Sequence, residues 1–323
     1  MTITFTDRLI SAIKTKKSIL CVGIDPQLNH LPPHLIEKYK GMDNVLYQVF
    51  EDYGWRIVEA VAPHAVAVKP NLAFFERHGY QGYAAYESIV EHAREFGLLV
   101  ITDGKRGDGG DTADAYAEGY LGRTKDEDKS GIQKDQNPFR PDALTINGYI
   151  GDDCVTRFTR EMKLHGTGAF VVTKTSFKPN SRIEQLLTSR GTKVWEEMAK
   201  CVDEWGNGTE GEAGWKNLGA VIGATYQEET IKARQLLPNS FFLVPGYGAQ
   251  GGGAKAAVLG ADKDGLGIIV NSSRGITNAW NDQHTGFKTE PENFAEAIEL
   301  AARKACLELN MALTDAGKDQ ILL

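Results

Sequence analysis

The sequence lacks the features that mark secreted, membrane or nucleic-acid-binding proteins. Only four of its 323 residues are cysteines, with no CxxC pair and no Cys/His cluster at metal-ligand spacing. We therefore expect a reduced, cytoplasmic protein without a metal site. No apolar run approaches the roughly 20 residues of a membrane span, and the N-terminus lacks the apolar segment and cleavage site of a signal peptide. The net charge of −7 provides no basic surface for nucleic acid.

What the sequence does contain is a series of short, nearly continuous apolar runs. Their lack of polar/apolar alternation predicts strands that are buried on both faces, as in a parallel sheet. Eight runs fit this description, at residues 18–25, 65–70, 98–103, 142–147, 168–174, 218–225, 241–246 and 266–271.

Amphipathic helical patterns separate most of these runs, so strand and helix alternate along the chain. Eight repeats favour a (β/α)₈ barrel, also called a TIM barrel. A doubly wound open sheet is the alternative, but no GxGxxG follows the first strand. We expect one barrel domain over residues 1–323. A charged stretch at 122–141 lacks apolar periodicity and is interpreted as a surface insertion.

Charged and polar side chains recur where the predicted strands end. Catalytic groups of such barrels gather at the carboxyl ends of the strands, and buried charges there are costly unless they are paired or used. The residues at these ends are Asp25, Lys69, Asn71, Asp103, Lys105, Asn147, Lys174 and Ser176. Any single one of them could instead form a salt bridge at the barrel mouth, and for Lys174 both interpretations stay open.

The stretch "LLVITDGKRGDGGDTADAY" (98–116) has the densest charge pattern of the chain. Asp103 and Lys105 are two residues apart, so an extended backbone would point both side chains the same way. Asp108 follows, beside Gly109 and Gly110. A solvated charged turn is the alternative. Flanking carboxylates would keep a lysine charged and aimed, and such an ammonium can stabilise a developing carbanion and then protonate it.

The loops after the last two strands suggest an anion site. Residues 245–256 are rich in glycine, and Arg274 lies in "NSSRGI" at 271–276. Barrels of this class often bind phosphate with these two loops. Glycine-rich backbone can present several N–H groups, and an arginine adds a bidentate contact. We expect a phosphorylated small metabolite whose reactive end lies near Lys105.

These motifs together resemble the long, bacterial-type branch of the orotidine 5′-phosphate decarboxylase family. "DGKRGD" followed by "GGDT" is similar to the family's DxKxxD motif. "VGIDP", "VAVKPNLAFFERHG", "TKTS", "VIGATY", "VPGYGAQGG" and "VNSSRGI" follow in the family's order, from residue 18 to about 276. DxKxxD alone would not be specific, because related sugar-phosphate barrels share it.

The resemblance implies a cofactor-free homodimeric barrel that converts orotidine 5′-phosphate to uridine 5′-monophosphate in pyrimidine synthesis. Lys105 matches the lysine that protonates C6 of the pyrimidine, and Asp103 matches the carboxylate beside it. Asp108 and Lys69 complete the expected catalytic set: Asp108 is contributed by the partner subunit together with Thr112, and Lys69 joins the charged network and binds the ribose with Asp25. Ser176 matches the residue at the pyrimidine ring, and Gln250 and Arg274 match the phosphate side. Gly246 and Asn71 complete the expected substrate-binding set.

The sequence departs from the family pattern in places. Gly104 and Gly109 stand where alanine and isoleucine are expected, and "TSFKP" replaces the usual Thr-Ser-Asn-Pro. Two other functions stay open: a magnesium-dependent enzyme acting on a ketose phosphate, with Asp25, Asp103 and Asp108 as possible ligands, and an inactive barrel that binds a nucleotide or a protein.

Overall fold

Eight parallel strands form a closed barrel in the computed structural model, which describes residues 3–125, 135–136, 139–177, 179–248, 253–282 and 286–322. The strands follow the order β1-β10-β9-β8-β7-β6-β3-β2 around the barrel. They are β1 (Leu20–Ile24), β2 (Ala67–Pro70), β3 (Leu99–Arg106), β6 (Ala143–Ile146), β7 (Gly168–Lys174), β8 (Lys216–Ile222), β9 (Ser240–Val244) and β10 (Ile268–Ser272). Each corresponds to one of the apolar runs, so the predicted (β/α)₈ barrel is confirmed.

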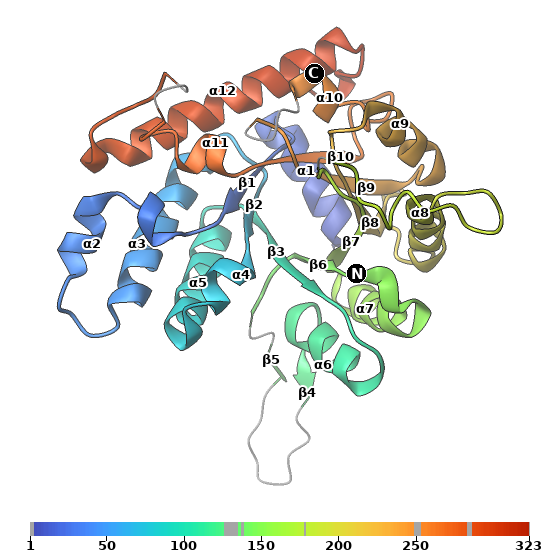
Figure 1. Cartoon of the computed structure of the whole chain (residues 1–323), viewed down its shortest axis with the longest axis horizontal. Coiled ribbons are helices and arrows are strands. Elements are labelled where there is room, and N and C mark those ends of the chain that lie inside the picture. The colour runs from blue at the N-terminus through green and yellow to red at the C-terminus, as the bar shows by residue number, and fades with distance from the viewer. Residues whose placement is uncertain are drawn as a thin grey trace.

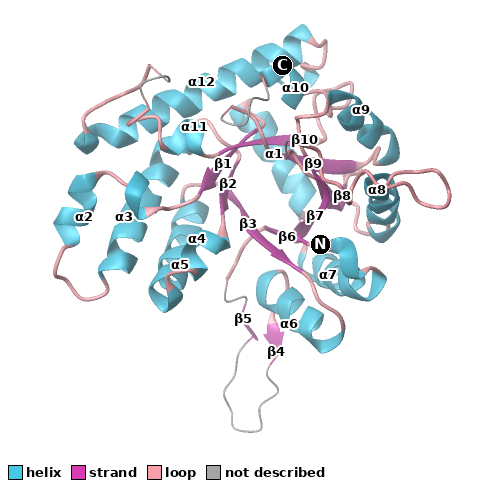
Figure 2. Cartoon of the chain, in the orientation of Figure 1, coloured by secondary structure: helices cyan, strands magenta, loops and turns pink. Residues whose placement is uncertain are grey.

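Helices surround the strands on the outside of the barrel (Figures 1 and 2). They are α1 (Phe5–Lys16), α2 (Pro33–Tyr39), α3 (Val45–Val61), α4 (Leu72–Glu76), α5 (Gly79–Glu95), α6 (Gly110–Tyr120), α7 (Asp152–His165), α8 (Val194–Trp205), α9 (Gln227–Leu236), α10 (Ala254–Ala257), α11 (Arg274–Thr277) and α12 (Phe294–Asp315). No helix in these ranges is both long and apolar enough to cross a membrane.

The strands are buried on both faces because the barrel interior and the helices cover them. All five residues of β1 and all five of β9 are buried, as the absence of alternation predicts. The third strand is longer than expected, since β3 runs past Asp103 to Arg106. Lys105 therefore lies within the strand.

Helix α1 packs across the amino end of the barrel. The side chain of Thr4 accepts a hydrogen bond from the Asp7 N–H and caps the helix. The Phe5 ring meets Phe170 of β7 edge-on, with centroids 5.9 Å apart. A Cβ on Gly168, the first residue of β7, would lie 2.3 Å from the Phe5 ring. This tight contact holds α1 against the amino end of β7, opposite the carboxyl ends where catalytic groups of such barrels gather.

The described part of the 122–141 segment includes a short antiparallel pair. Strand β4 (Thr124–Lys125) pairs with β5 (Asp135–Gln136), and the pair projects from the barrel near α6 (Figure 2). Most of the remaining segment lies outside the described residues. The four cysteines are all free.

Candidate active site

Two adjacent pockets open at the carboxyl ends of the barrel strands. The first has a volume of about 290 Å³ and is lined by Lys69, Asn71, Asp103, Lys105, Thr145, Val172, Thr175, Ser176, Phe177, Val221, Leu243, Pro245 and Asn271. The second has a volume of about 320 Å³ and is lined by Asp25, Gln27, Asn71, Phe74, Pro245, Gly246, Tyr247, Asn271, Ser273 and Arg274. Three residues, Asn71, Pro245 and Asn271, line both pockets, so one elongated ligand can occupy the two. A wider cavity of about 390 Å³ borders α10, α11 and α12 and contains none of the predicted site residues.

Asp103 lies between two lysines in the first pocket. Its Oδ2 is 2.8 Å from Lys69 Nζ and its Oδ1 is 2.6 Å from Lys105 Nζ. Residues Asn71 and Asp103 pair as neighbours across β2 and β3, which brings these two strand ends together. Lys69 and Asp103 are buried, whereas about half of the Lys105 side chain is exposed to the pocket and solvent. The predicted convergence of these three residues is therefore confirmed.

The charges of this group support one another. Burial disfavours the ionised form of Asp103, but the adjacent Lys69 and Lys105 outweigh that effect and lower its pKa. Burial likewise disfavours the charge on Lys69, yet Asp103 and Asp25 outweigh it and raise the pKa of this lysine. The Asp103 carboxylate is thus held between two lysine side chains, and Lys105 lines the pocket.

The backbone at Lys105 differs from the predicted extended conformation. Lys105 has φ 45°, in the left-handed region, and the register between β3 and β6 shifts between Thr102 and Arg106. The prediction that Asp103 and Lys105 meet is right, but its reason is wrong, because the strand bulges between them.

Thr145 of β6 holds this bulge and was missed by the sequence reasoning. Its hydroxyl donates to Asp103 Oδ1 at 2.8 Å and accepts the Lys105 N–H at 3.0 Å. The side chain is 2% exposed. One signal was available, since Thr145 is the polar residue inside the apolar run at 142–147.

The second pocket is polar and combines the half-buried acid Asp25 with the cation of Arg274. Burial raises the pKa of Asp25, partly offset by the charge of Lys69. Asp25 Oδ1 and Asn271 Oδ1 are buried without a hydrogen-bond partner, so a ligand hydroxyl or amide could satisfy them. Arg274 is exposed and lines the same pocket. Asn271 and Ser273 are further lining residues that the predicted set did not include.

Ser176 and Phe177 form one wall of the first pocket. The Ser176 carbonyl accepts a hydrogen bond from Thr225 Oγ1 at 2.8 Å, and the Phe177 carbonyl accepts one from Tyr226 Oη at 3.1 Å. A Cβ on Gly223 would lie 2.7 Å from Ser176 N. Glycine at this position therefore lets the segment pack closely against the loop after β8.

Lys174, for which two interpretations stayed open, forms a buried salt-bridge cluster. It is 1% exposed, and its Nζ lies 2.9 Å from Glu184 Oε2, 3.4 Å from Glu229 Oε2 and 2.7 Å from Asn180 Oδ1. Both glutamates lie outside the two pockets. The structure favours the structural interpretation.

The remaining predicted residues fall in three places. Asn71 and Gly246 line the pockets. Asp108 and Thr112 are exposed and lie outside both pocket linings. Asp108 precedes α6, and Thr112 lies in its first turn. Gln250 lies outside the described residues. Within the described ranges, no group of three or more His, Cys, Asp or Glu side chains is arranged to hold a metal ion.

A closed barrel with a lysine–aspartate–lysine array at its carboxyl end, next to a polar pocket that contains an arginine, defines a (β/α)₈-barrel enzyme. Residues 18–288 match the model of the orotidine 5′-phosphate decarboxylase / HUMPS family. The chain therefore belongs to this family.

Similar proteins extend over nearly the whole chain. Orotidine 5′-phosphate decarboxylase of Caldicellulosiruptor saccharolyticus is 38% identical over 93% of this chain and 98% of its own length. The Rhodopirellula baltica enzyme of the same name is 36% identical over 96% and 99%. Among solved structures, a putative orotidine 5′-phosphate decarboxylase from Streptomyces avermitilis superposes with a TM-score of 0.75 at 29% identity, covering 97% of this chain and 98% of that one.

Proposed function

We propose that this enzyme decarboxylates orotidine 5′-phosphate to uridine 5′-monophosphate and carbon dioxide in de novo pyrimidine synthesis, without a cofactor. The observation that carries the proposal is the Lys69–Asp103–Lys105 array in the first pocket. Relatives that carry the decarboxylase name match it over almost their full length.

The two pockets suggest how the substrate lies. The pyrimidine fits the first pocket, whose walls combine Ser176 with the apolar Val172, Val221 and Leu243. The ribose would lie where the pockets join, near Asp25, Lys69 and Asn71. The phosphate would then reach the second pocket, where Arg274 and the backbone at Gly246 are available. The family resemblance also assigns Gln250 to the phosphate. Binding energy from this distant phosphate can help to organise the reacting end.

The chemistry follows from the position of Lys105. When the bond between C6 and the carboxylate breaks, carbon dioxide leaves and the electron pair stays on C6. The Lys105 ammonium stabilises this charge and donates a proton to C6, and the neutral amine then regains a proton from solvent. Asp103 directs the ammonium through their 2.6 Å ion pair, and it would lie beside the departing carboxylate.

Two further parts of the proposal concern assembly and location. We infer a homodimer in which Asp108 and Thr112 of each subunit complete the other subunit's site, because both are exposed near the barrel mouth of the single chain. We also infer that the enzyme works in the cytoplasm, where thiols stay reduced, because its four cysteines are free.

Purified protein with orotidine 5′-phosphate tests the activity by the change in absorbance, with and without EDTA. We expect turnover that EDTA does not affect. Lys105→Ala should lower kcat by about 10³-fold or more, since it removes both a proton donor and a charge stabiliser. Lys263→Ala, on the exposed surface, is the control. Activity lost on chelation would favour the metal-dependent alternative, and full activity of Lys105→Ala would refute the mechanism.

Mixing two inactive variants tests the shared site. Each hybrid of a Lys105→Ala subunit with an Asp108→Asn subunit contains one site with both residues intact. A one-to-one mixture that exchanges freely should recover about a quarter of wild-type activity, the statistical share of intact sites. No recovery despite exchange would contradict sharing.

A further inference from the structure

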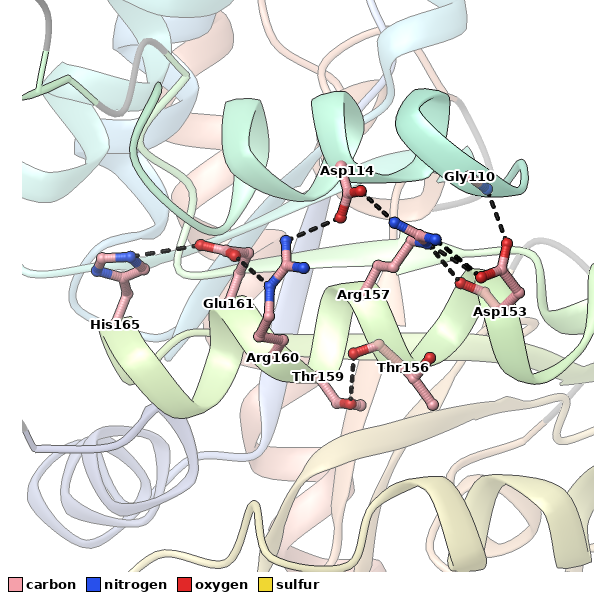
Figure 3. Close-up of polar contacts among 9 residues, drawn as sticks. All are labelled: Gly110, Asp114, Asp153, Thr156, Arg157, Thr159, Arg160, Glu161 and His165. Atoms are coloured by element: carbon pink, nitrogen blue, oxygen red, sulfur yellow. Dashed lines mark hydrogen bonds and ion pairs between the residues drawn. The ribbon is translucent and has the colours of Figure 1, made fainter. Parts of the chain in front are cut away.

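Helices α6 and α7 lie side by side and are joined at the first turn of α6 (Figure 3). Asp153, in the first turn of α7, accepts a hydrogen bond from the Gly110 N–H through Oδ2 at 2.7 Å. Arg157 holds the other oxygen, with Nη2 2.9 Å and Nε 3.2 Å from Asp153 Oδ1. The carboxylate is thus oriented from its own helix while it contacts the next one.

A second connection lies one turn further along α6. Asp114 accepts hydrogen bonds from Arg160 Nη2, at 2.8 Å, and from Arg157 Nη1. Arg157 therefore bridges Asp153 and Asp114, as Figure 3 shows. With contacts at two successive turns, α7 fixes both the position and the rotation of the amino end of α6.

The contact between Asp153 and the Gly110 N–H also explains why position 109 is a glycine. Its φ is −105°, a conformation that any residue adopts, so the backbone does not require glycine. A Cβ at this position would lie 3.2 Å from Asp153 Oδ2. A larger side chain would therefore push against the carboxylate that binds Gly110. The family resemblance led us to expect an apolar isoleucine here, and in this chain a polar contact takes its place.

We propose that Asp153 is a positioning residue that fixes the segment from Asp108 to Thr112 for use in the partner subunit's active site, and that Gly109 is small to admit its carboxylate. The inference rests on the proposed shared site. Gly110 lies midway between Asp108 and Thr112, so a contact at its N–H restrains both. A displacement of this segment by about 1 Å can lower activity up to a hundredfold.

A purely structural role is disfavoured by exposure. The Asp153 side chain is 61% exposed, and exposed ion pairs contribute only about 0–1 kcal/mol to stability. Removing the carboxylate should leave the fold intact and change activity, which separates positioning from stability.

The test compares Asp153→Ala with Asp152→Ala. Asp152 is the matched control, because it is an acid in the same helical turn whose side chain accepts from Trp205 of α8 instead. We expect Asp153→Ala to lower kcat/KM by about ten- to a hundredfold at unchanged melting temperature, and Asp152→Ala to stay within about twofold of wild type. Full activity of Asp153→Ala would overturn the inference.

Hybrid dimers locate the defect. In a hybrid of Asp153→Ala with Lys105→Ala, the Lys105 of the first subunit works with an undisturbed Asp108 segment from the second. Activity should therefore rise to about a quarter of wild type. If Asp108→Asn with Lys105→Ala recovers activity but Asp153→Ala with Lys105→Ala does not, the inference fails and the shared site stands. If neither pair recovers despite exchange, the shared site itself is wrong.

Gly109→Val tests the second half of the inference. The added side chain should lower kcat/KM in the wild-type background and have much less effect in the Asp153→Ala background, where the carboxylate is gone. An equal loss in both backgrounds would show that Asp153 is not the reason for the glycine at position 109.

Discussion

Asp103 and Lys105 contact each other at 2.6 Å across a backbone that is not extended. Lys105 adopts a left-handed φ of 45°, which costs a residue other than glycine about 1–2 kcal/mol. The bulge that contains Lys105 persists because neighbouring groups hold it. The ammonium is therefore directed by its surroundings as much as by its partner carboxylate.

Thr145→Val should lower activity without unfolding the protein. The substitution keeps the shape but removes the hydroxyl that binds both Asp103 and the Lys105 N–H. Leaving the Lys105 N–H unpaired and removing one of the partners of Asp103 should cost about 1–3 kcal/mol of stability, and misplacing the ammonium should lower kcat about tenfold. Denaturant unfolding and steady-state kinetics measure the two effects. Thr145→Ser, which keeps the hydroxyl, is the control, and an equal loss in that variant would contradict the role of the hydroxyl.

Asp25→Asn should stabilise the free enzyme at neutral pH and weaken substrate binding. Burial raises the pKa of Asp25, so the folded state loses stability as the pH rises from the unfolded pKa of about 3.9 toward the folded value. Asparagine avoids this penalty. The gain in melting temperature should be present at pH 7 and shrink toward pH 4, while KM rises. A gain of equal size at both pH values would rule out ionisation as its cause.

Arg274→Ala should weaken recognition of the phosphate. Losing a hydrogen bond between charged groups costs about 1.5–3 kcal/mol, so kcat/KM for orotidine 5′-phosphate should fall about ten- to a hundredfold. Orotidine, which lacks the phosphate, should react equally slowly with the variant and the wild type. Arg190→Ala, at an exposed position, is the control. Equal losses for both substrates would place Arg274 elsewhere in the mechanism.

Replacing residues 126–134 by two glycines should leave the barrel intact. We propose that residues 1–323 form one domain and that 122–141 is a surface insertion. Lys125 and Asp135 pair directly across β4 and β5, so a two-residue turn can join them. Thermal unfolding should remain a single transition within a few degrees of wild type. A large loss of melting temperature would show that the segment is part of the core.

The barrel was predictable because strands buried on both faces appear in the sequence as nearly continuous apolar runs. The eight runs can be recognised without knowing which distant residues they contact. The charged site followed, since the carboxyl ends of parallel strands meet at one mouth and bring Lys69, Asp103 and Lys105 together. Asp25 and Arg274 line the neighbouring pocket for the same reason.

Other features depend on contacts that sequence order does not reveal. The left-handed turn at Lys105 depends on Thr145, a residue from another strand. The partners of Lys174 come from a loop and from α9, and no local pattern shows whether such a lysine is used in chemistry or paired. Gly109 had no explanation until Asp153 was placed beside it.

The Thr145 hydroxyl also limits how this barrel can be recombined. Asp103 of β3 accepts a hydrogen bond from this hydroxyl of β6, although Asp103 and Thr145 are 42 positions apart in the sequence. A chimera that takes β3 from one homologue and β6 from another would inherit the lysine without the hydroxyl that supports its backbone, unless both parents have it. These two strands should therefore be exchanged together, as one transferable unit.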